Sequence, residues 1–502
     1  MEKKKFIKDF LKKNSITICL AVFAIAYILI RSFGFSLGLS PDSTNYLREA
    51  NALLKGYGFN NHAGAGQEGF FGIWPIGYPA LIAFVALVTG FEVFYAAKII
   101  TVIVFLVMTA MFIRRFGENA WVYLLFFCNP GFIDCMHNVS SENLYLLAVL
   151  WFAFCCFDVW EGKGKENKAI IFLGISSFMA FMSRWVGAFT IGISGLLAIL
   201  YFFGITVDKN KKKALKIAGV TFLNAVIILS YLFLIREKTG YFTGMYRIPS
   251  EEPKMTLLYL LIKAENAELN NAVMGIFSVN TYVFVIVAMV LIGYFIKKLW
   301  QDKLKDKLPM ALLLTSFIYW CGYVYTRFQT DMEPFNYRVL LPSTLPIGVT
   351  LTYYILKNER VLELLRSFQC SGKRKVLLIL VLFALCFQLH NNCAIMGTPY
   401  NAYETTKQEI EERYKDIPSG SLVVTEDWVI NFLRMDLKRC TVNDCDSDSL
   451  EHVLYAVEHD DYPHVYIQTD YLNFLLDMVD DESKYVELRK YADYPEKLIQ
   501  LK

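Results

Sequence analysis

The sequence predicts an α-helical membrane protein that crosses the bilayer many times and ends in a small α/β domain. Three observations lead to this fold class. Of the 502 residues, 55% are hydrophobic and only 19% are charged, whereas soluble domains have about 25% charged residues. Apolar runs long enough to cross a bilayer as helix, about 20 residues each, recur from Ser15 to Met396. After Met396 these runs stop, and short alternating segments and helical stretches follow.

Charge and cysteine content exclude several other classes. The 50 Lys and Arg residues nearly balance the 47 Asp and Glu residues, so nothing indicates a nucleic-acid-binding protein. The 11 cysteines are scattered and show neither metal-ligand spacing nor a dense disulfide framework. No small-residue cleavage site follows the first apolar run. We therefore interpret that run as an uncleaved span with its basic flank in the cytoplasm.

About eleven spans are predicted from the apolar runs. They cover residues 15–35, 93–113, 119–134, 142–160, 168–182, 185–207, 214–235, 276–296, 309–326, 339–356 and 376–396. The apolar stretch from Ile76 to Gly90 is only about fifteen residues long, which suits a re-entrant or interfacial helix better than a span. With that stretch left out, every second loop is basic, as the positive-inside rule requires. The N-terminus is then cytoplasmic and the C-terminus extracytoplasmic.

Two predicted outer loops are long, and each is expected to carry a helix. The first loop, residues 36–92, should hold one from Asp42 to Lys55, and the second, residues 236–275, should hold one at about 254–272. Residues 1–396 then form the membrane domain, and residues 397–502 form the extracytoplasmic α/β domain. Cys440 and Cys445 lie in the latter, either as a disulfide or as two free thiols.

This topology collects ionisable residues at the outer face of the membrane. They are Asp42, Glu68, Asp134, His137, Glu142, Arg184, Arg247, Arg327, Asp331, Glu333 and Arg338. A charge near a span is costly, so such residues are usually paired, directed to the interface or functional. The set favours an external cavity for an anionic ligand. The alternative is that each arginine only anchors a helix among lipid headgroups.

A series of motifs resembles one family of membrane enzymes. Asp42 follows the first span, with Tyr46 and Ala50 at helical spacing. The later motifs are WPIGYP at 74–79, SSENLY at 140–145, FMSRWVG at 181–187, TGYFTGMYRIPS at 239–250 and RVLLPSTLP at 338–346. Their order is similar to that in the GT-C glycosyltransferases. More specifically, residues 15–395 resemble the family 39 type, the bacterial relatives of protein O-mannosyltransferases and lipid A aminoarabinose transferases.

The resemblance implies a GT-C fold and a reaction at the outer face of a bacterial cell membrane. A monosaccharide would move from a polyprenyl-phosphate donor to a hydroxyl of a lipid, glycan or protein acceptor. The implied catalytic acids are Asp42, as general base, and Glu142. The implied ligands of the donor phosphate are Arg338, Arg247, Arg184 and Arg327. The aminoarabinose branch has a Lys where this chain has Trp74, so an arginine would have to replace that phosphate contact.

Other assignments stay open at the sequence level. Tyr46, Trp74, Tyr78 and His137 are candidates for contacts with the sugar or the lipid. Asp42 and Glu142 also fit simple helix-start acids, which favour the positive end of a helix dipole. No cofactor is expected, and the alternative is a divalent metal held by His137 with Asp134 and Glu142.

Two other function classes compete with sugar transfer. The first is a transporter or lipid flippase, for which the sequence offers neither internal repeats nor mid-membrane charges. The second is an envelope polysaccharide polymerase or ligase, which would use a diphosphate-linked oligosaccharide.

Overall fold

The computed structural model describes most of the chain in two compact units. The described residues are 9–34, 37–61, 69–125, 130–162, 166–205, 209–272, 306–331, 335–369, 402–440, 447–459, 462–477, 486–491 and 498–502, with single positions at 293, 297, 376, 379 and 382. Unit 1 comprises Met1–Ser32, Gly72–Tyr78 and Lys98–Gly397, and unit 2 comprises Phe33–Phe71, Pro79–Ala97 and Thr398–Lys502. Unit 2 thus takes in two segments of the first predicted outer loop besides the C-terminal residues.

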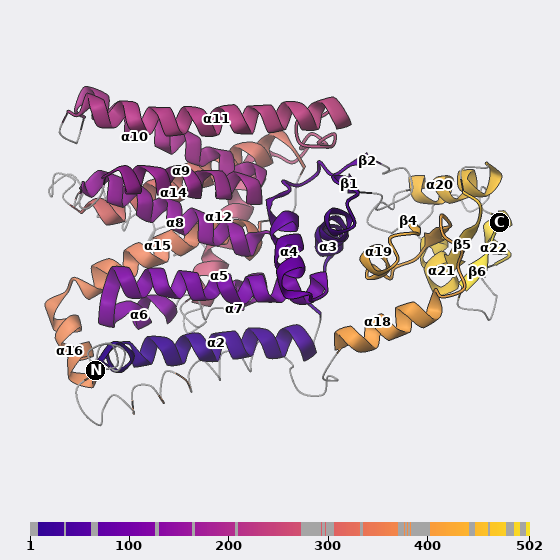
Figure 1. The fold of residues 1–502 in the computed structure, drawn as a ribbon, viewed down its shortest axis with the longest axis horizontal. Helices are drawn as coiled ribbons and strands as arrows, with labels where there is room; N and C mark the ends of the chain where they lie inside the picture. The colour runs from indigo at the N-terminus through magenta and orange to yellow at the C-terminus, as the bar shows by residue number, and fades with distance from the viewer. Residues whose placement is uncertain are drawn as a thin grey trace. The chain divides into compact units, whose positions relative to one another are not determined.

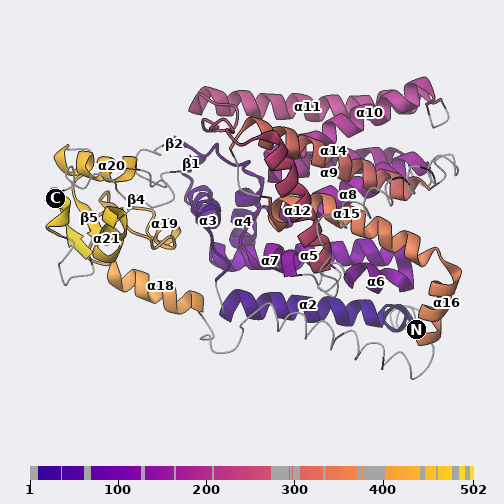
Figure 2. The ribbon, with the colours of Figure 1, turned by 180° about the vertical axis from the view of Figure 1, so that it is seen from behind.

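Unit 1 is built from long helices that run side by side (Figures 1 and 2). They are α2 Ser15–Gly34, α5 Val93–Phe116, α8 Glu142–Glu161, α9 Glu166–Ser183, α10 Phe189–Phe203, α11 Lys211–Thr239, α14 Lys307–Gln329 and α15 Tyr337–Leu356. Shorter elements join or flank them. These are η1 Gly117–Asn119, α6 Ala120–Leu124, α7 Pro130–His137, η3 Trp185–Ala188, α12 Lys254–Ala272 and α16 Glu359–Gln369.

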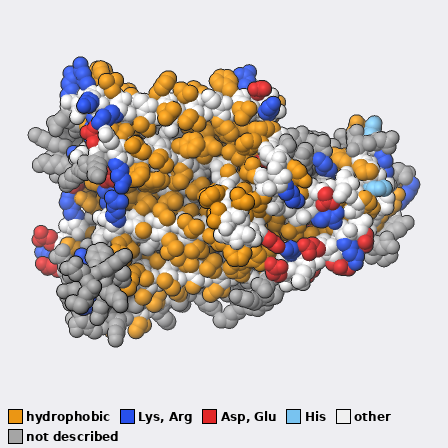
Figure 3. Space-filling model, in the orientation of Figure 1, with side chains coloured by type: hydrophobic (Ala, Val, Ile, Leu, Met, Phe, Trp, Pro, Cys, Tyr) orange, Lys and Arg blue, Asp and Glu red, His pale blue; other side chains and the backbone are white. Residues whose placement is uncertain are grey.

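Seven helical stretches in the described part are long and apolar enough to cross a membrane. They are Ser15–Phe33, Val93–Leu124, Glu142–Glu161, Trp185–Phe203, Lys211–Thr239, Lys307–Gln329 and Tyr337–Leu356. Hydrophobic side chains cover most of the visible surface of the long helices (Figure 3). On α11, for example, Phe222 and Leu223 are largely exposed, as side chains that face lipid must be. The chain is therefore an integral, multi-pass membrane protein.

Several predicted elements have clear counterparts. The helix expected at 254–272 is α12, and the short apolar helix expected near Ile76 to Gly90 is α4, Gly77–Thr89. The predicted span at 168–182 is α9, which is not among the seven stretches. The described parts of the predicted span at 119–134 belong to the short helices α6 and α7, because Pro130 starts a new helix there. The predicted spans at 276–296 and 376–396 lie outside the described residues, apart from single positions.

The long helices of unit 1 begin and end at two opposite ends of the unit. At one of these, which we call the basic end, lysines and arginines link neighbouring helix ends, namely the C-terminal ends of α5, α8 and α15 and the starts of α9, α11 and α14. The contacts are Arg115–Asp158 at 2.8 Å, Lys216–Glu166 at 3.0 Å, Lys357–Asp306 at 2.6 Å, and Lys213 to the carbonyl of Val159 at 2.6 Å. The described flanks of the loops that the sequence assigns to the cytoplasm therefore share one end of the unit. Which side of the membrane that end faces stays a prediction.

Unit 2 contains the predicted helix of the first outer loop. This helix, α3, runs Pro41–Leu54 and is followed by the small hairpin of β1 Asn60–Asn61 and β2 Gly69–Phe70. It begins as a capping box: the Ser40 side chain accepts from the backbone of Ser43, and the Ser43 side chain accepts from the backbone of Ser40. Pro41 suits the first helical turn, where its missing N–H costs nothing. The prediction of a helix at Asp42 to Lys55 is confirmed.

A four-stranded sheet forms the C-terminal part of unit 2. Its strands are β3 Leu422–Val424, β4 Lys438–Cys440, β5 Val465–Gln468 and β6 Leu498–Gln500, in the order β4-β3-β5-β6. Strand β3 is parallel to β4 and β5, and β6 is antiparallel to β5. The accompanying helices are α18 Ala402–Arg413, α19 Ile430–Leu433, α20 Ser447–Glu458, α21 Thr469–Asp477 and α22 Val486–Arg489.

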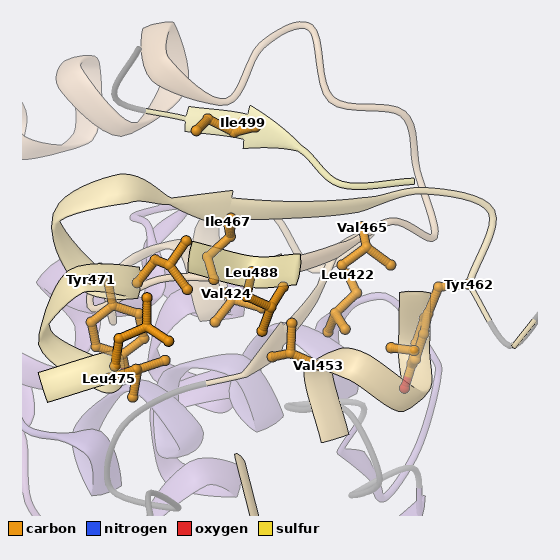
Figure 4. Close-up of a cluster of buried hydrophobic side chains, with 13 residues drawn as sticks. Leu422, Val424, Val453, Tyr462, Val465, Ile467, Tyr471, Leu475, Leu488 and Ile499 are labelled. Carbon is orange, nitrogen blue, oxygen red and sulfur yellow. The ribbon is translucent and has the colours of Figure 1, made fainter. Parts of the chain in front are cut away.

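The core of this α/β part lies between the sheet and its helices. Leu422 and Val465 from the strands pack with Val453 of α20 and Leu475 of α21 in one buried cluster (Figure 4). Parallel strands joined through helices give such a layered core. The predicted C-terminal α/β architecture is confirmed. The pairing of Cys440 with Cys445 concerns side chains outside the described part.

Candidate functional site

One buried carboxylate at the end of unit 1 opposite the basic end binds two arginines. Glu142 Oε1 accepts from Arg338, at 2.9 Å from Nε and 2.8 Å from Nη2. The same oxygen forms an ion pair with Arg184 Nη1. Glu142 is only 1% exposed, whereas the Arg184 and Arg338 side chains are 28% and 19% exposed. We call these three residues the Glu142 cluster.

Three helix ends position the Glu142 cluster. Glu142 is the first residue of α8, and Arg184 is the extended residue between α9 and η3. Arg338 is the second residue of α15, where its backbone N–H donates to the side chain of the cap residue Asn336 at 3.0 Å. The sequence motifs at 140–145, 181–187 and 338–346 thus meet at one place. The predicted clustering of these residues holds for Glu142, Arg184 and Arg338.

Two guanidinium groups share one carboxylate in the Glu142 cluster. Charge-assisted hydrogen bonds to a carboxylate are the strong ones in proteins, and they compensate the cost of burying Glu142. Its other oxygen, Oε2, has no hydrogen-bond partner among the described residues. The cluster therefore fixes two partly exposed guanidinium groups beside one buried carboxylate.

Three buried tyrosines pack against one another near the Glu142 cluster. Tyr145, one turn along α8 from Glu142, lies 6.1 Å from Tyr319 of α14 by ring centroid. Tyr319 stacks on Tyr323 and donates from its hydroxyl to the carbonyl of Val339 at 2.7 Å. These rings belong to a buried cluster with Leu340 of α15. They hold the starts of α8 and α15 together, which fixes the two ends that carry Glu142 and Arg338.

The WPIGYP segment packs beside Arg184. Trp185 Nε1 donates to the carbonyl of Ile73 at 2.8 Å, and the backbone N–H of Ile76 donates to the hydroxyl of Tyr231 at 3.2 Å. Gly77 lies so close to Met182 that a Cβ there would be 2.4 Å from its carbonyl oxygen. Tyr78 is fully buried. The side chain of Trp74 remains half-buried.

The other two candidate arginines lie around the second long loop. Arg327 is buried and paired with Glu252 at 3.3 Å and with Asp331 at 3.0 Å. Arg247 is half-buried, and among the described residues its side chain hydrogen-bonds only Thr243, at 3.4 Å. Burial lowers the pKa of Arg247. Of the four predicted phosphate ligands, Arg247 therefore lacks a carboxylate partner in the described structure, whereas Arg327 already has two.

The residues considered for a metal have other partners. Asp134 forms an ion pair with Arg31, and His137 is buried with Nδ1 3.4 Å from Ser32 Oγ. The His137 carbonyl accepts from Lys98 Nζ at 2.6 Å. Within the described ranges, no group of three or more His, Cys, Asp or Glu side chains is arranged to hold a metal ion. The geometry gives the metal alternative no support.

Asp42 and Tyr46 belong to unit 2. Asp42 is half-buried in the first turn of α3, where Ser40 rather than Asp42 makes the cap, and Tyr46 is 1% exposed. The sugar or lipid contact predicted for Tyr46 stays a prediction. The partnership of Asp42 with the arginines of unit 1 stays a prediction. Glu68 and Glu333 lie outside the described residues.

Two acids on α12, the half-buried Glu265 and the buried Glu268, were not among the sequence candidates. Glu265 Oε1 accepts from Ser343 Oγ of α15 at 3.4 Å, and burial raises the pKa of Glu265 to about 8. Burial also raises the pKa of Glu268 to about 7, with a further contribution from Asp134. Their i, i+3 spacing puts them on the face of α12 that carries buried Leu261. That spacing is the sequence signal that distinguishes them from solvated charges.

Comparison with known proteins identifies the fold. No protein-family model matches the chain, and no curated protein matches it by sequence. ArnT from Cupriavidus metallidurans, solved with undecaprenyl phosphate, is similar over 92% of this chain and 95% of its own, with 12% identity and a TM-score of 0.56. The Archaeoglobus fulgidus oligosaccharyltransferase AglB, solved with Zn and sulfate, is similar over 92% of this chain and 70% of its own, with 11% identity and a TM-score of 0.52. The chain therefore has the GT-C fold, the membrane architecture of ArnT and AglB.

Proposed function

We propose that the protein is a membrane glycosyltransferase that moves a monosaccharide from a polyprenyl-phosphate donor to an acceptor hydroxyl. The observation that carries the proposal is the Glu142 cluster, in which Arg184 and Arg338 share one buried carboxylate. The fold adds support, because ArnT, which is similar over almost the whole chain, was solved with undecaprenyl phosphate. The site and the fold together favour a lipid-linked phosphate as ligand.

The reaction needs two kinds of group. The acceptor oxygen attacks the anomeric carbon of the sugar and loses its proton to a general base, while the bond from that carbon to the phosphate oxygen breaks. The departing polyprenyl phosphate gains one negative charge. It needs no strong acid, because a phosphate monoester is a good leaving group. It benefits from fixed cations aimed at the oxygens where the charge develops.

The arginines supply those cations in unequal ways. Arg184 and Arg338 are held by Glu142 and are partly exposed, so we assign the donor phosphate to their exposed sides. Arg247 is the further cation assigned to the phosphate, because it has no carboxylate partner in the described part of the loop. Arg327 is assigned a structural role, since Glu252 and Asp331 already neutralise it.

The two acids take different roles in this proposal. Asp42 acts as the general base: it is half-buried and opens α3 next to the first apolar helix in sequence. A positioned base contributes about 10²–10⁴-fold to such a reaction. Glu142 positions the arginines, because a carboxylate bound to two guanidinium groups is a poor proton acceptor. Trp74 is the candidate for stacking on the sugar or lipid, since Tyr78 and His137 are buried.

The test is transfer by the purified protein in lipid nanodiscs. A radiolabelled polyprenyl-phosphate monosaccharide is supplied with an extract of acceptor lipids, glycans and proteins. A polyprenyl-diphosphate oligosaccharide is supplied in parallel. Transfer from the monophosphate donor, abolished in Asp42→Asn and in Arg338→Ala, is the expected result. Transfer from the diphosphate donor alone would identify a polymerase or ligase. Donor movement across the bilayer of proteoliposomes without transfer would identify a flippase, and either result overturns the proposal.

A further inference from the structure

The basic end of unit 1 contains a cavity that the proposed sugar transfer does not use. It has a volume of about 230 Å³ and lies between the C-terminal ends of α5 and α8 and the start of α9. Its polar lining consists of Arg114, Arg115, Lys168 and Asp158, and its aromatic lining includes Trp151, Phe154 and Phe172. Lys168 and Phe172 also line a neighbouring hollow with Lys216.

The cations of this cavity exceed its carboxylates. Asp158 pairs with Arg115 at 2.8 Å, and the Arg115 guanidinium lies over the rings of Phe154 and Phe157, at 5.1 and 4.9 Å. These contacts fix Arg115 and use up the carboxylate. Lys168 Nζ lies 5.2 Å from the centre of the Phe172 ring. Neither Lys168 nor the exposed Arg114 has a carboxylate partner in the described structure.

Apolar surface continues from the cavity along the same helices. On α5, Leu106 and Val107 are 49% and 41% exposed; on α9, Ile171 and Ile175 are 54% and 45% exposed. Figure 3 shows this pattern for the unit: hydrophobic side chains cover the helices, and Lys and Arg side chains gather at the end on the left of the view. The cationic lining of the cavity is thus continuous with an exposed hydrophobic surface. A phospholipid matches both, because its phosphate is anionic and its acyl chains are apolar.

We propose that this cavity binds the headgroup of an anionic phospholipid, with the acyl chains along the exposed faces of α5 and α9. The phosphate would lie between Arg114 and Lys168, and Arg115 would complete the cationic wall. Basic pockets between membrane helices bind such headgroups. The cavity is separate from the Glu142 cluster. Asp158, at the cavity, lies 16 residues along α8 from Glu142, or about 24 Å at 1.5 Å per residue, which is most of the thickness of the hydrocarbon core of a bilayer.

Native mass spectrometry of the full-length protein tests the proposal. The protein is released from nanodiscs that contain phosphatidylcholine with phosphatidylglycerol or cardiolipin, and retained lipid is counted. Wild type should retain an anionic lipid in preference to phosphatidylcholine, and the double variant Arg114→Ala/Lys168→Ala should bind it about tenfold more weakly. The matched control is Lys209→Ala/Lys212→Ala, which removes two exposed lysines of the same end outside the cavity.

Three outcomes would overturn the proposal. Equal losses in the two double variants would mean that the basic end attracts anionic lipid only by its overall charge. Unchanged retention in Arg114→Ala/Lys168→Ala would place the lipid elsewhere. A thermal shift with inorganic phosphate as large as that with phosphatidylglycerol would identify a soluble anion as the ligand. Size-exclusion profiles of the variants show whether each remains folded. If the double variant is not folded, the single variant Lys168→Ala replaces it in the lipid-binding measurement.

Discussion

Arg48 donates from Nη1 to both the backbone carbonyl and the side-chain oxygen of Asn431, at 2.6 and 3.2 Å, across 383 positions of sequence. Its Nη2 also donates to the carbonyl of Met435 at 3.1 Å. Asn51, one turn further along α3, donates to the carbonyl of Phe432 at 3.1 Å. These bonds fasten α3, the helix that carries Asp42, to α19 within unit 2. The C-terminal domain therefore helps to hold the helix that carries the proposed base, Asp42.

Replacing Arg48 with methionine should loosen unit 2. Arg48 is 1% exposed, and its loss leaves buried carbonyl groups without donors, at a cost of about 1–3 kcal/mol each. We expect faster hydrogen exchange in α3 and α19 and a lower rate of sugar transfer. The matched control is Lys55→Met, which removes an exposed cation just after the same helix. Equal exchange in the two variants would show that Arg48 does not fasten α3.

The stability of the α3 region should fall as the pH rises. Glu49 is fully buried, neither of its oxygens has a hydrogen-bond partner among the described residues, and burial raises its pKa from 4.5 to about 8, although the charge of Arg48 opposes the shift. Between these two values the folded state keeps a proton that the unfolded state releases, so each step up in pH favours unfolding. The loss is complete once the pH exceeds about 8.

Hydrogen exchange of α3 at pH 6, 7, 8 and 9, corrected for the intrinsic pH dependence of exchange, measures this effect. Protection should decrease from pH 6 to 8 in the wild type and then level off by pH 9. In Glu49→Gln, which stays neutral, the decrease should be absent. The same decrease in Glu49→Gln would assign the titration to another group.

The helices could be predicted more fully than the contacts between them. The start of α3 can be predicted because Ser40, Pro41 and Ser43 are local signals for a helix N-terminus. Helix α12 can be predicted from its composition. The alternation of basic and less basic loops also assigned Glu142, Arg184 and Arg338 to the same face of the membrane. Their ion pairs could not be predicted, because a carboxylate at a helix start serves equally well as a base, a cap or a counterion.

Other features had no local signal. Strand β4, Lys438–Cys440, has two basic residues among three and none of the apolar alternation that indicated β3, β5 and β6. It is a strand because it pairs with β3. Arg48 was not a candidate because its partners lie on α19, far along the chain. Such residues acquire their roles only from tertiary contacts.

Removing the carboxylate of Glu142 should break an ion pair to each arginine of the cluster. In Glu142→Gln, two neighbouring guanidinium groups lose their shared counterion, and breaking a buried ion pair typically costs about 3–5 kcal/mol. We expect a lower unfolding temperature and loss of transfer. Glu237→Gln, at an exposed position near the end of α11, is the matched control. An unchanged unfolding temperature in Glu142→Gln would mean that the cluster does not hold α8, α9 and α15 together.

A methyl group at Gly244 should displace the loop that carries Arg247. Gly244 has φ +76°, and an added Cβ would lie 2.0 Å from the carbonyl carbon of Gly72 and 2.1 Å from its oxygen. The two glycines thus let the second long loop pack against Gly72 and Ile73, just before the WPIGYP segment. Gly240 is the matched control, because it has a similar φ of +81° but nothing within 4 Å of an added Cβ. Both alanine variants carry the same backbone strain of about 1–2 kcal/mol, and only Gly244→Ala adds the clash. Initial rates over a range of donor concentrations should therefore give a raised KM for Gly244→Ala and a near-normal KM for Gly240→Ala, whereas equal KM values would show that this packing does not position Arg247 for the donor.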